Sequence, residues 1–306
     1  MSPAADSTPE YRAAGTDLSE RRRSGVSRGP LLDVPPTAEM FGIRSSADGV
    51  TRIGALTTIA AVAAEPRVRA AYPGLAAAAG GLATPQIRRM ATIGGNIAQR
   101  NRCWYFRNPH IDCLKKGGDG CPARAGNHLY GVVFDSAPCV APHPSTMAAA
   151  LLAYGAHVNT SQRENLPIEA ALGDGRLPSA ETALQPGELI AEIVLPASPQ
   201  GERGAYKRAI GRAYAEWPLV ELIVRATLKD GAFDGLRIVA GGVAPVPRRL
   251  MAAEAAALGK PASSDTLAAA AQAANEGANP LPGARYKLDL LQGLVRDVLE
   301  EVASRG

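Results

Sequence analysis

The segment "TPQIRRMATIGGN" (Thr84–Asn96) carries the pattern that decides the fold of this chain. It ends in a glycine turn, in which Gly94 and Gly95 allow the backbone to approach a ligand closely. Several N–H groups of such a turn can point at one anion, and Thr92 and Asn96 add polar side chains. The segment therefore predicts a phosphate-binding loop.

A second glycine segment, "AAGTDL", runs from Ala13 to Leu18 and has Gly15 at its centre, with Thr16 as a side-chain donor. Neither segment has the spacing G-x-G-x-x-G, so the pattern excludes a Rossmann dinucleotide fold. Each segment taken alone is typical of an ordinary turn. Their combination in one chain is what favours a site for a phosphate-bearing cofactor.

The length and charge of the chain limit its class. A chain of 306 residues is long enough for about two domains. Its formal net charge of +4 argues against a nucleic-acid binder, which usually shows a basic stripe. No apolar run approaches the ~20 residues that a membrane span needs. The N-terminal residues lack a signal-peptide pattern, so we expect a cytoplasmic protein, with export alongside a signal-bearing partner still open.

Helical and extended patterns alternate without a regular βαβ rhythm, which predicts an α+β fold. We expect a short strand at 52–56, a helix capped by Thr57 or Thr58, and a second helix capped by Ser145. A composition break at 197–204 predicts a boundary between a domain at 1–196 and another at 201–306. In the second domain a turn at 230–231 joins two long strands, and two helices close the chain.

All four cysteines fall in one window, with the spacing C-x9-C-x7-C-x17-C: Cys103, Cys113, Cys121 and Cys139. Six Lys or Arg and only two acidic residues lie between positions 100 and 127. Disulfides are disfavoured in a large chain without a signal peptide. Both structural zinc and a [4Fe–4S] cluster use four thiolates, and the positive charges would offset a cluster's negative charge. The residues alone leave zinc and the cluster open.

Eight short motifs occur in the order found in one family, and together they reach from about residue 11 to the C-terminus. The chain resembles the FAD-binding subunit of molybdenum hydroxylases, the group of xanthine dehydrogenase, carbon monoxide dehydrogenase and aldehyde oxidoreductase. The motifs are "GTDL", "RIGALTT", "YPGLAAAA", "TPQIRRMATIGGN", "GELIAEIVLP", "AYKRA", "WPLVE" and "GGVAPVPRR".

The resemblance implies a fold of two FAD-binding subdomains of the vanillyl-alcohol oxidase (PCMH-like) type, split near residue 52. A small α+β C-terminal domain would follow, as in carbon monoxide dehydrogenase flavoproteins. It also implies FAD contacts, with Leu189, Ile190 and Lys207 against the isoalloxazine ring. The remaining implied contacts are Ala13, Ala14, Gly15, Thr16, Asp17, Leu18, Thr57, Thr92, Gly94, Gly95, Asn96 and Ser145.

One branch of the family, closest to the bacterial aldehyde oxidoreductases, carries an extra [4Fe–4S] cluster in a loop after the second glycine segment. The window at 100–142 resembles that loop, and the resemblance implies that Cys103, Cys113, Cys121 and Cys139 are the four ligands. His128 and His143 are rival ligands by chemistry, but four thiolates suffice, so we interpret both as structural.

Three positions depart from the family pattern. The first glycine loop has Ala14-Gly15 where relatives usually have two glycines. Thr146 stands where relatives usually have an aspartate that meets the FAD, so that contact is in doubt. Only about ten residues precede the first loop, where relatives carry a further strand and helix. We therefore expect a short first subdomain that leans on a partner or leaves a sheet edge open.

The sequence shows no nucleophile and base pair for substrate chemistry. The resemblance places that chemistry on a large molybdenum-cofactor subunit, with a small subunit that carries two [2Fe–2S] clusters. Electrons would reach FAD here and leave to an external acceptor. The substrate, an aldehyde or an aromatic heterocycle, stays undetermined. The alternatives are a zinc-stabilised structural subunit without redox role, and a self-sufficient flavin oxidase that needs a base of its own.

Overall fold

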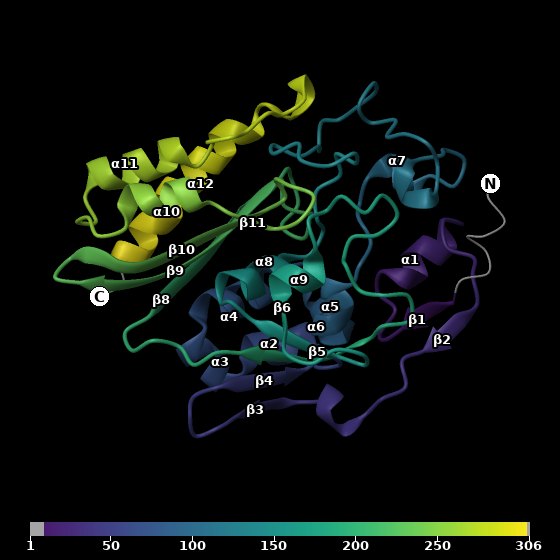
Figure 1. Cartoon of the computed structure of the whole chain (residues 1–306), viewed down its shortest axis with the longest axis horizontal. Coiled ribbons are helices and arrows are strands. Elements are labelled where there is room, and N and C mark those ends of the chain that lie inside the picture. The colour runs from purple at the N-terminus through teal and green to yellow at the C-terminus, as the bar shows by residue number, and fades with distance from the viewer. Residues whose placement is uncertain (1–8, 305–306) are drawn as a thin grey trace.

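The computed structural model describes residues 9–304, which fold into three sheets covered by helices (Figure 1). The first sheet has two parallel strands, β1 (Glu10–Arg12) and β2 (Leu31–Asp33), joined through helix α1 (Leu18–Arg23). The expectation for residues 1 to about 10 falls largely outside the described residues. Within the described part of the chain, β1 and β2 pair only with each other, so this small sheet has two open edges.

The second sheet has five antiparallel strands in the order β3-β4-β7-β5-β6. Strand β3, which precedes residue 52, pairs with β4, so β3 belongs to the second sheet; the expected subdomain split near residue 52 stays a prediction. The first and second sheets divide between β2 and β3, because the strand partner decides which sheet a segment joins. The strands are β3 (Ile43–Ser45), β4 (Thr51–Gly54), β5 (His157–Thr160), β6 (Leu166–Pro167) and β7 (Ile190–Leu195).

Seven helices accompany the second sheet, and helix α8 lies at their centre. All eight residues of α8 are buried, because it packs against helices α4, α6 and α9 and also against strands of the third sheet. The helices are α2 (Ile59–Ala64), α3 (Pro66–Ala71), α4 (Pro73–Gly81), α5 (Pro85–Met90), α6 (Ile93–Ile97), α8 (Thr146–Ala153) and α9 (Ile168–Leu172). Helix α8 therefore ties the two larger halves of the molecule together.

The third sheet is antiparallel, in the order β11-β10-β9-β8, and three of its strands, β8, β9 and β10, are the longest in the described part of the chain (Figure 1). The turn between β9 and β10 falls at Asp230 and Gly231, both with positive φ, as the sequence predicts. Three helices cover this sheet and bury a second core. The elements are β8 (Arg203–Ala209), β9 (Val220–Lys229), β10 (Ala232–Gly241), β11 (Arg248–Arg249), α10 (Met251–Ala257), α11 (Ser264–Ala273) and α12 (Lys287–Ser304).

The cysteine-bearing segment between α6 and α8 is mostly loop, with only the short helix α7 (Trp104–Arg107) and a 3₁₀ turn at Leu114–Lys116. In Figure 1 it lies above α1 and reaches toward the third sheet. No helix in residues 9–304 is long and apolar enough to cross a membrane.

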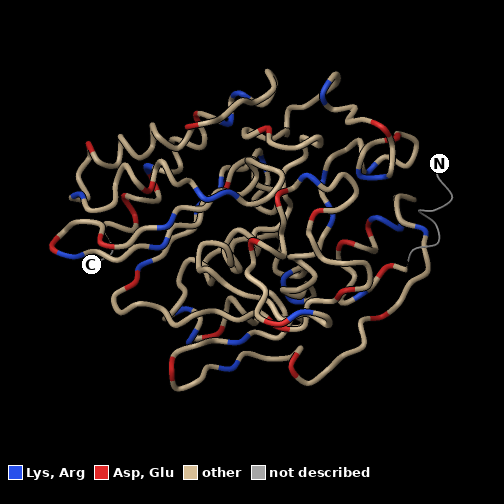
Figure 2. The backbone as a smooth tube through the Cα atoms, in the orientation of Figure 1, with Lys and Arg blue, Asp and Glu red and all other residues tan. Residues whose placement is uncertain are grey.

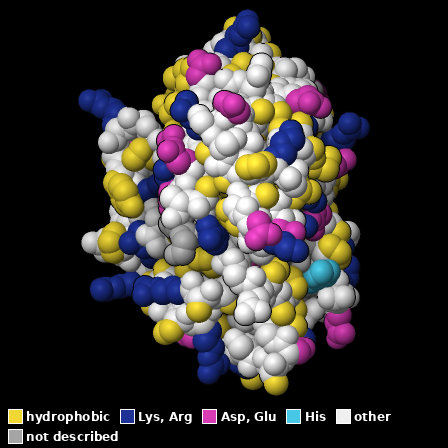
Figure 3. All heavy atoms as spheres, turned by 90° about the vertical axis from the view of Figure 1, so that its left-hand side faces the viewer, with side chains coloured by type: hydrophobic (Ala, Val, Ile, Leu, Met, Phe, Trp, Pro, Cys, Tyr) yellow, Lys and Arg dark blue, Asp and Glu magenta, His cyan; other side chains and the backbone are white. Residues whose placement is uncertain are grey.

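Charged residues of both signs occur on many segments of the described chain, separated by long uncharged stretches (Figure 2). The molecular face over the third sheet likewise mixes Lys and Arg with Asp, Glu and apolar side chains (Figure 3). This face therefore presents both signs of charge interleaved with apolar groups.

Candidate functional site: two cavities and a cysteine cluster

The two glycine segments face one cavity of about 150 Å³. It lies where helices α1 and α6 and the residues before strand β7 meet. Most of the residues that the sequence assigns to the cofactor line this cavity: all of Ala13–Leu18, together with Thr92, Gly94, Gly95, Leu189 and Ile190. The fold thus brings together segments that lie up to 170 residues apart in the chain, on the order of half its length.

The first glycine loop presents free N–H donors. Gly15 adopts φ +72°, a left-handed conformation that glycine adopts without strain. The N–H groups of Gly15, Thr16, Asp17 and Leu18 find no hydrogen-bond acceptor within residues 9–304. A run of N–H groups without protein acceptors beside a cavity matches what a pyrophosphate requires.

The second glycine loop is held rigidly against strand β4. Thr92 caps α6 by accepting a hydrogen bond from the N–H of Gly95. The N–H of Gly94 donates to the carbonyl of Ala55, and a Cβ on Gly94 would lie 2.8 Å from the Cβ of Ala55. Glycine at this position is therefore required by close packing, which fixes one wall of the cavity.

Asp17 connects the first glycine loop to the cysteine segment. Its carboxylate accepts hydrogen bonds from Arg21 at 3.1 Å, Arg102 at 2.5 Å and Arg107 at 2.8 Å. These arginines hold the pKa of Asp17 below its usual value, although burial alone would raise it. Figure 2 shows the corresponding red and blue segments beside one another around α1 and α7. The carboxylate is thus committed to protein cations, which keeps its negative charge compensated next to the cavity.

Three predicted cofactor residues support the loops and do not line the cavity. Thr57 is buried, donates its hydroxyl to the carbonyl of Gly42, and accepts from the N–H of Ile93. The carbonyl oxygen of the Asn96 side chain accepts from the Ser145 hydroxyl at 2.7 Å. Ser145 in turn caps α8, as the sequence predicts. Their positions couple the second glycine loop to the central helix.

Lys207 does not lie at this site, so the structure does not support the expectation that it borders the flavin. It lines neither of the two larger cavities; its ammonium pairs with Glu301 at 3.4 Å and donates to a carbonyl of α12. The reason is the alternation of side chains along β8, which turns Tyr206 and Arg208 toward the opposite face of the sheet.

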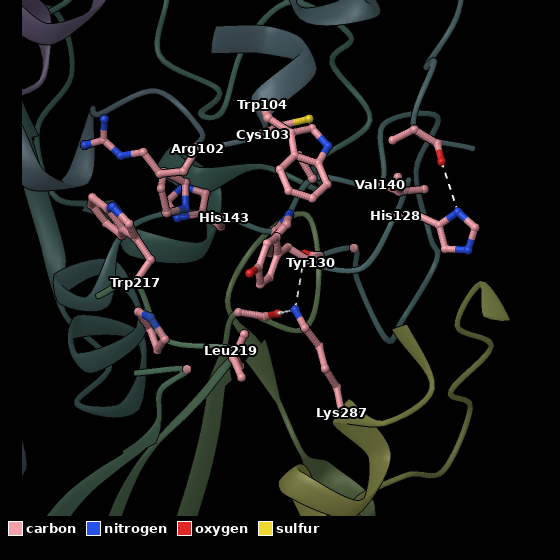
Figure 4. A pocket seen from close by; sticks show the side chains of 18 of the residues that line it. Arg102, Cys103, Trp104, His128, Tyr130, Val140, His143, Trp217, Leu219 and Lys287 are labelled. Atoms are coloured by element: carbon pink, nitrogen blue, oxygen red, sulfur yellow. Dashed lines mark hydrogen bonds between the residues drawn. The ribbon is translucent and has the colours of Figure 1, made fainter. Parts of the chain in front are cut away.

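A second cavity, of about 310 Å³, opens beside the first. Gln99 lines the first cavity and donates to the carbonyl of Pro144, while Arg102 donates to Gln99; both Pro144 and Arg102 line the second cavity. Its walls are largely aromatic and apolar, with Trp104, Tyr130 and Trp217 labelled in Figure 4. A cavity of this size and lining suits a planar ring system.

Besides His143, two buried ionisable groups, Glu221 and Lys287, line the second cavity, and the sequence analysis assigned a role to neither. Glu221 accepts hydrogen bonds from the hydroxyls of Thr146 at 2.8 Å and Tyr206 at 2.9 Å, and burial raises its pKa to about 6. Lys287 donates to the carbonyls of Tyr130 and Gly242 (Figure 4), and burial lowers its pKa to about 7. In sequence, both residues resemble ordinary positions on a strand and a helix.

The four cysteines surround a third, small cavity together with Tyr105, Phe106 and Lys115. Cys113 and Cys139 are buried, whereas Cys103 and Cys121 are partly exposed. The histidines that sequence chemistry offers as rival ligands point elsewhere. The Nδ1 of His128 bonds the carbonyl of Ala123, and the Nδ1 of His143 accepts from the N–H of Ser145.

Backbone N–H groups surround the sulfur atoms. Burial raises the pKa of Cys103 and Cys113, and the hydrogen bond with Cys121 together with burial raises that of Cys139; backbone N–H groups near each Sγ oppose these rises. Cys121 and Cys139 share a hydrogen bond that lowers the pKa of Cys121 to about 5. Hydrogen bonds to sulfur are a feature of iron–sulfur sites.

The sequence suggested that the six Lys and Arg residues of this segment offset the negative charge of a cluster. In the structure, only three of them act on the thiols. Arg100 pairs with Glu181, while Arg102 and Arg107 pair with Asp17 and Glu20. Charges that act on the thiols come from Lys115, Lys116 and Arg124. The remaining arginines are therefore structural links to α1 and to the segment before β7, because each one has a carboxylate close at hand.

The cysteines do not have the geometry of a single-metal site. In residues 9–304, which include all four, no group of three or more His, Cys, Asp or Glu is arranged to hold one metal ion. Tetrahedral zinc needs thiolates at about 2.3 Å from one centre. A four-iron cluster holds its thiolates around a larger body, whereas the cavity among the four cysteines measures about 10 Å³.

Two family models and one curated relative match nearly the whole chain. Residues 4–198 match the model for the FAD binding domain in molybdopterin dehydrogenase, and residues 209–302 match that for the CO dehydrogenase flavoprotein C-terminal domain. The chain is 37% identical over 305 residues to the aldehyde oxidoreductase FAD-binding subunit PaoB of Escherichia coli, covering 97% of this chain and 92% of that protein.

Other relatives and solved structures agree. The medium chain of carbon monoxide dehydrogenase from Hydrogenophaga pseudoflava is 28% identical, over 90% of this chain and 82% of that one. A solved carbon monoxide dehydrogenase structure from the same organism superposes with a TM-score of 0.75 at 25% identity, covering 99% of this chain and 92% of its counterpart. Quinoline 2-oxidoreductase from Pseudomonas putida 86 shares the fold, with a TM-score of 0.74 at 19% identity over 96% and 89% of the two chains.

Proposed function

Because the chain belongs to the FAD-binding medium subunits of molybdenum hydroxylases, we propose that it binds one FAD across the two neighbouring cavities. The subunit is part of an oxidoreductase, with the fold of the carbon monoxide dehydrogenase FAD subunit. The finer proposal is that residues 9–196 form the two-subdomain PCMH-type unit. The observation that carries the FAD site is the pair of glycine loops facing one cavity.

The first cavity would hold the pyrophosphate. The N–H groups of Gly15 to Leu18 have no acceptor within residues 9–304, and Thr92, Gly94 and Gly95 form the opposite wall. The second cavity would receive the isoalloxazine ring, because its aromatic walls adjoin the first cavity through Gln99. Leu189 and Ile190, which the resemblance places against the ring, line the first cavity, so in this arrangement they would contact FAD on the pyrophosphate side of the ring. When bound, FAD supplies reversible two-electron chemistry; the protein residues bind it, orient it and exclude water.

The test of FAD binding is acid release and quantification of flavin from the purified chain. We expect about one FAD per chain, bound non-covalently, since neither glycine loop contains a histidine or cysteine. A folded preparation that carries no flavin and cannot be reconstituted with FAD would overturn the proposal. The variant Gly94→Ala should lose flavin while other surface variants keep it, because its Cβ would collide with Ala55.

We also propose that Cys103, Cys113, Cys121 and Cys139 hold one [4Fe–4S] cluster. The support is that all four surround one cavity, receive backbone N–H groups and have Lys115 and Lys116 nearby. Iron and zinc analysis after anaerobic purification is the test, with about four irons expected per chain. Stoichiometric zinc without iron would instead favour the alternative, a zinc-stabilised subunit without redox role.

A cysteine variant sharpens this test. Cys139→Ser should lose the iron and the broad visible absorption of the cluster, and it should loosen the segment at 100–142, because metal binding contributes to folding. The matched control is Ser136→Ala, in the same segment but not among the residues around the cysteine cavity, which should keep its iron. Equal iron content in both variants would contradict the ligand assignment.

The subunit itself would serve electron transfer within a complex. We propose a large molybdenum-cofactor subunit and a small [2Fe–2S] subunit as partners, and an external electron acceptor, in a cytoplasmic complex. Support comes from relatives whose names describe them as FAD-binding subunits or medium chains. The substrate would bind on the large subunit. A self-sufficient flavin oxidase would instead need a substrate base beside the ring, and the test is given below in the Discussion.

A further inference from the structure

The second cavity contains one buried carboxyl group whose hydrogen bonds are incomplete. Oε2 of Glu221 accepts from the hydroxyls of Thr146 and Tyr206. Oε1 lies beside Gly241 and accepts none of the hydrogen bonds found in residues 9–304, and the residue lines the cavity. A carboxylate oxygen left without a protein donor beside a cavity can accept a hydrogen bond from a ligand group placed there. Glu216, the other carboxyl at this cavity, bonds the N–H of Arg212 in its own loop.

We infer that Glu221 faces the bound flavin ring and sets its reduction potential through the charge of its carboxyl group. This inference rests on the proposed FAD site. Glu221 is 2% exposed, so its charge acts on the cavity with little screening by water. It lies on β9 opposite Arg208 of β8 and Gly241 of β10, which hold it in a fixed position. Glu221 is thus a positioning residue that acts on the ring electrostatically.

The charge of Glu221 responds to pH in the physiological range. Burial raises its pKa to about 6, and the hydroxyls of Thr146 and Tyr206 and the charge of Arg208 oppose this rise. Of the elements packed against it, α8 offers only Thr146 and β10 only Gly241 at this point, neither of which titrates. The other charged or titratable groups at the cavity are Arg102, Cys103, His128, Tyr130, His143, Glu216 and Lys287.

A charged carboxylate beside the ring opposes the arrival of electrons, whereas a neutral carboxylic acid does not. Reduction adds two electrons to the ring, and these come from substrate oxidation in the partner subunits. The protons that balance them come from water, and one of them can reside on Glu221 once the ring is reduced. The potential of the flavin should therefore become more negative, relative to a neutral side chain, as pH rises past the pKa of Glu221.

The test is spectroelectrochemical titration of the flavin in the FAD-loaded protein, comparing the native chain with Glu221→Gln at pH 5 and pH 8. We expect the two potentials to coincide at pH 5, where Glu221 is protonated and resembles glutamine. At pH 8 we expect the variant to have the more positive potential. A shift of equal size at both pH values, or no shift at either, in a variant that retains its flavin would overturn the inference.

Two further variants separate this effect from structural damage. Thr146→Val removes one donor to Glu221, so its pKa should rise and the potential difference should appear only at higher pH. Glu254→Gln changes an equally buried glutamate that pairs with Arg249 away from both cavities, and should leave the potential unchanged. If the native chain binds no FAD, the proposed function fails; if it binds FAD but shows no dependence on Glu221, only this inference fails.

Discussion

At the scale of single residues, Asp17 has the largest number of charged partners near the first glycine loop. Three arginines converge on its carboxylate, two of them from the cysteine-bearing segment. A change in the Asp17 side chain should therefore alter the structure both at the first glycine loop and beside Cys103. Arg102 shows the same coupling, since it pairs with Asp17 and also stacks over the ring of Trp217 at 4.3 Å.

Asp17→Asn should lower the free energy of unfolding by about 2 to 3 kcal/mol at pH 7, because hydrogen bonds to charged groups are lost. The folded pKa of Asp17 is depressed, so its stabilisation is present above its unfolded pKa and is lost as pH falls. Urea titrations of both proteins should therefore converge below about pH 4. A constant difference down to pH 2 would show that the carboxylate charge is not the cause.

Lys287 makes the opposite pH prediction. Its pKa is lowered to about 7, below the value of an unfolded lysine, so the unfolded chain binds more protons between about pH 7 and 10. Stability from this group therefore rises with pH across that window. Lys287→Met should remove this contribution. The unfolding free energy of the native chain, relative to that of the variant, should therefore rise between about pH 7 and 10. A pH-independent difference would mean that folding does not change the pKa of Lys287.

Residue by residue, the sequence predicted the glycine loops and the cysteine group but not the charges around them. The loops could be predicted from the sequence because a turn or close packing requires glycine at Gly15, Gly94 and Gly95. Lys207 lies outside the two larger cavities, because strand alternation decides which face it takes, and a single sequence leaves that register open. Glu221 ends the motif "WPLVE", but no local pattern reports that Glu221 or Lys287 is buried, since only tertiary packing buries them.

At the scale of elements, helix α8 carries the link between the second glycine loop and both sheets. Its cap, Ser145, is 1% exposed; its hydroxyl accepts from the N–H of Ala148 and donates to Asn96. The sequence predicted this helix and its cap because Ser followed by a run of Ala and Leu is a local pattern. That the cap also holds the glycine loop is a tertiary contact, so no local pattern reports it.

Ser145→Ala should cost about 1 to 2 kcal/mol of stability through the lost cap. It should also weaken FAD retention, because Asn96 loses the donor that orients it beside the second loop. Ser263→Ala, which removes the cap of α11 far from the cavities, is the matched control: it should lower stability without affecting flavin content. Similar flavin loss in both variants would mean that general destabilisation explains the effect.

The sequence patterns did not predict the two short strands of the first sheet, β1 and β2. Two strands pair in parallel with exposed apolar side chains, Tyr11, Leu31 and Leu32. The short strands at 10–12 and 31–33 have too few residues for a periodic pattern, so the sequence did not predict them. Within residues 9–304 neither outer edge of this sheet is paired, and its reliance on a partner chain stays a prediction.

At the scale of the whole molecule, the three sites lie close together at the junction of the sheets. The cysteine segment contacts the first glycine loop through arginines and contributes Cys103 and Trp104 to the aromatic cavity. Such an arrangement suits a protein that passes electrons and leaves the substrate reaction to a partner. The α+β architecture could be predicted from the mixed patterns, but the convergence of the sites depends on how the sheets pack.

The most direct test of the electron-transfer role is anaerobic reduction of the flavin by an aldehyde, followed by flavin absorbance. The account predicts that the flavin bleaches rapidly when this chain is in the complex purified from its native host. In the isolated, FAD-loaded chain the same aldehyde should leave the flavin oxidised, although dithionite reduces it. Bleaching of the isolated chain by the aldehyde at the rate of the complex would contradict the account and establish a self-sufficient flavin oxidase.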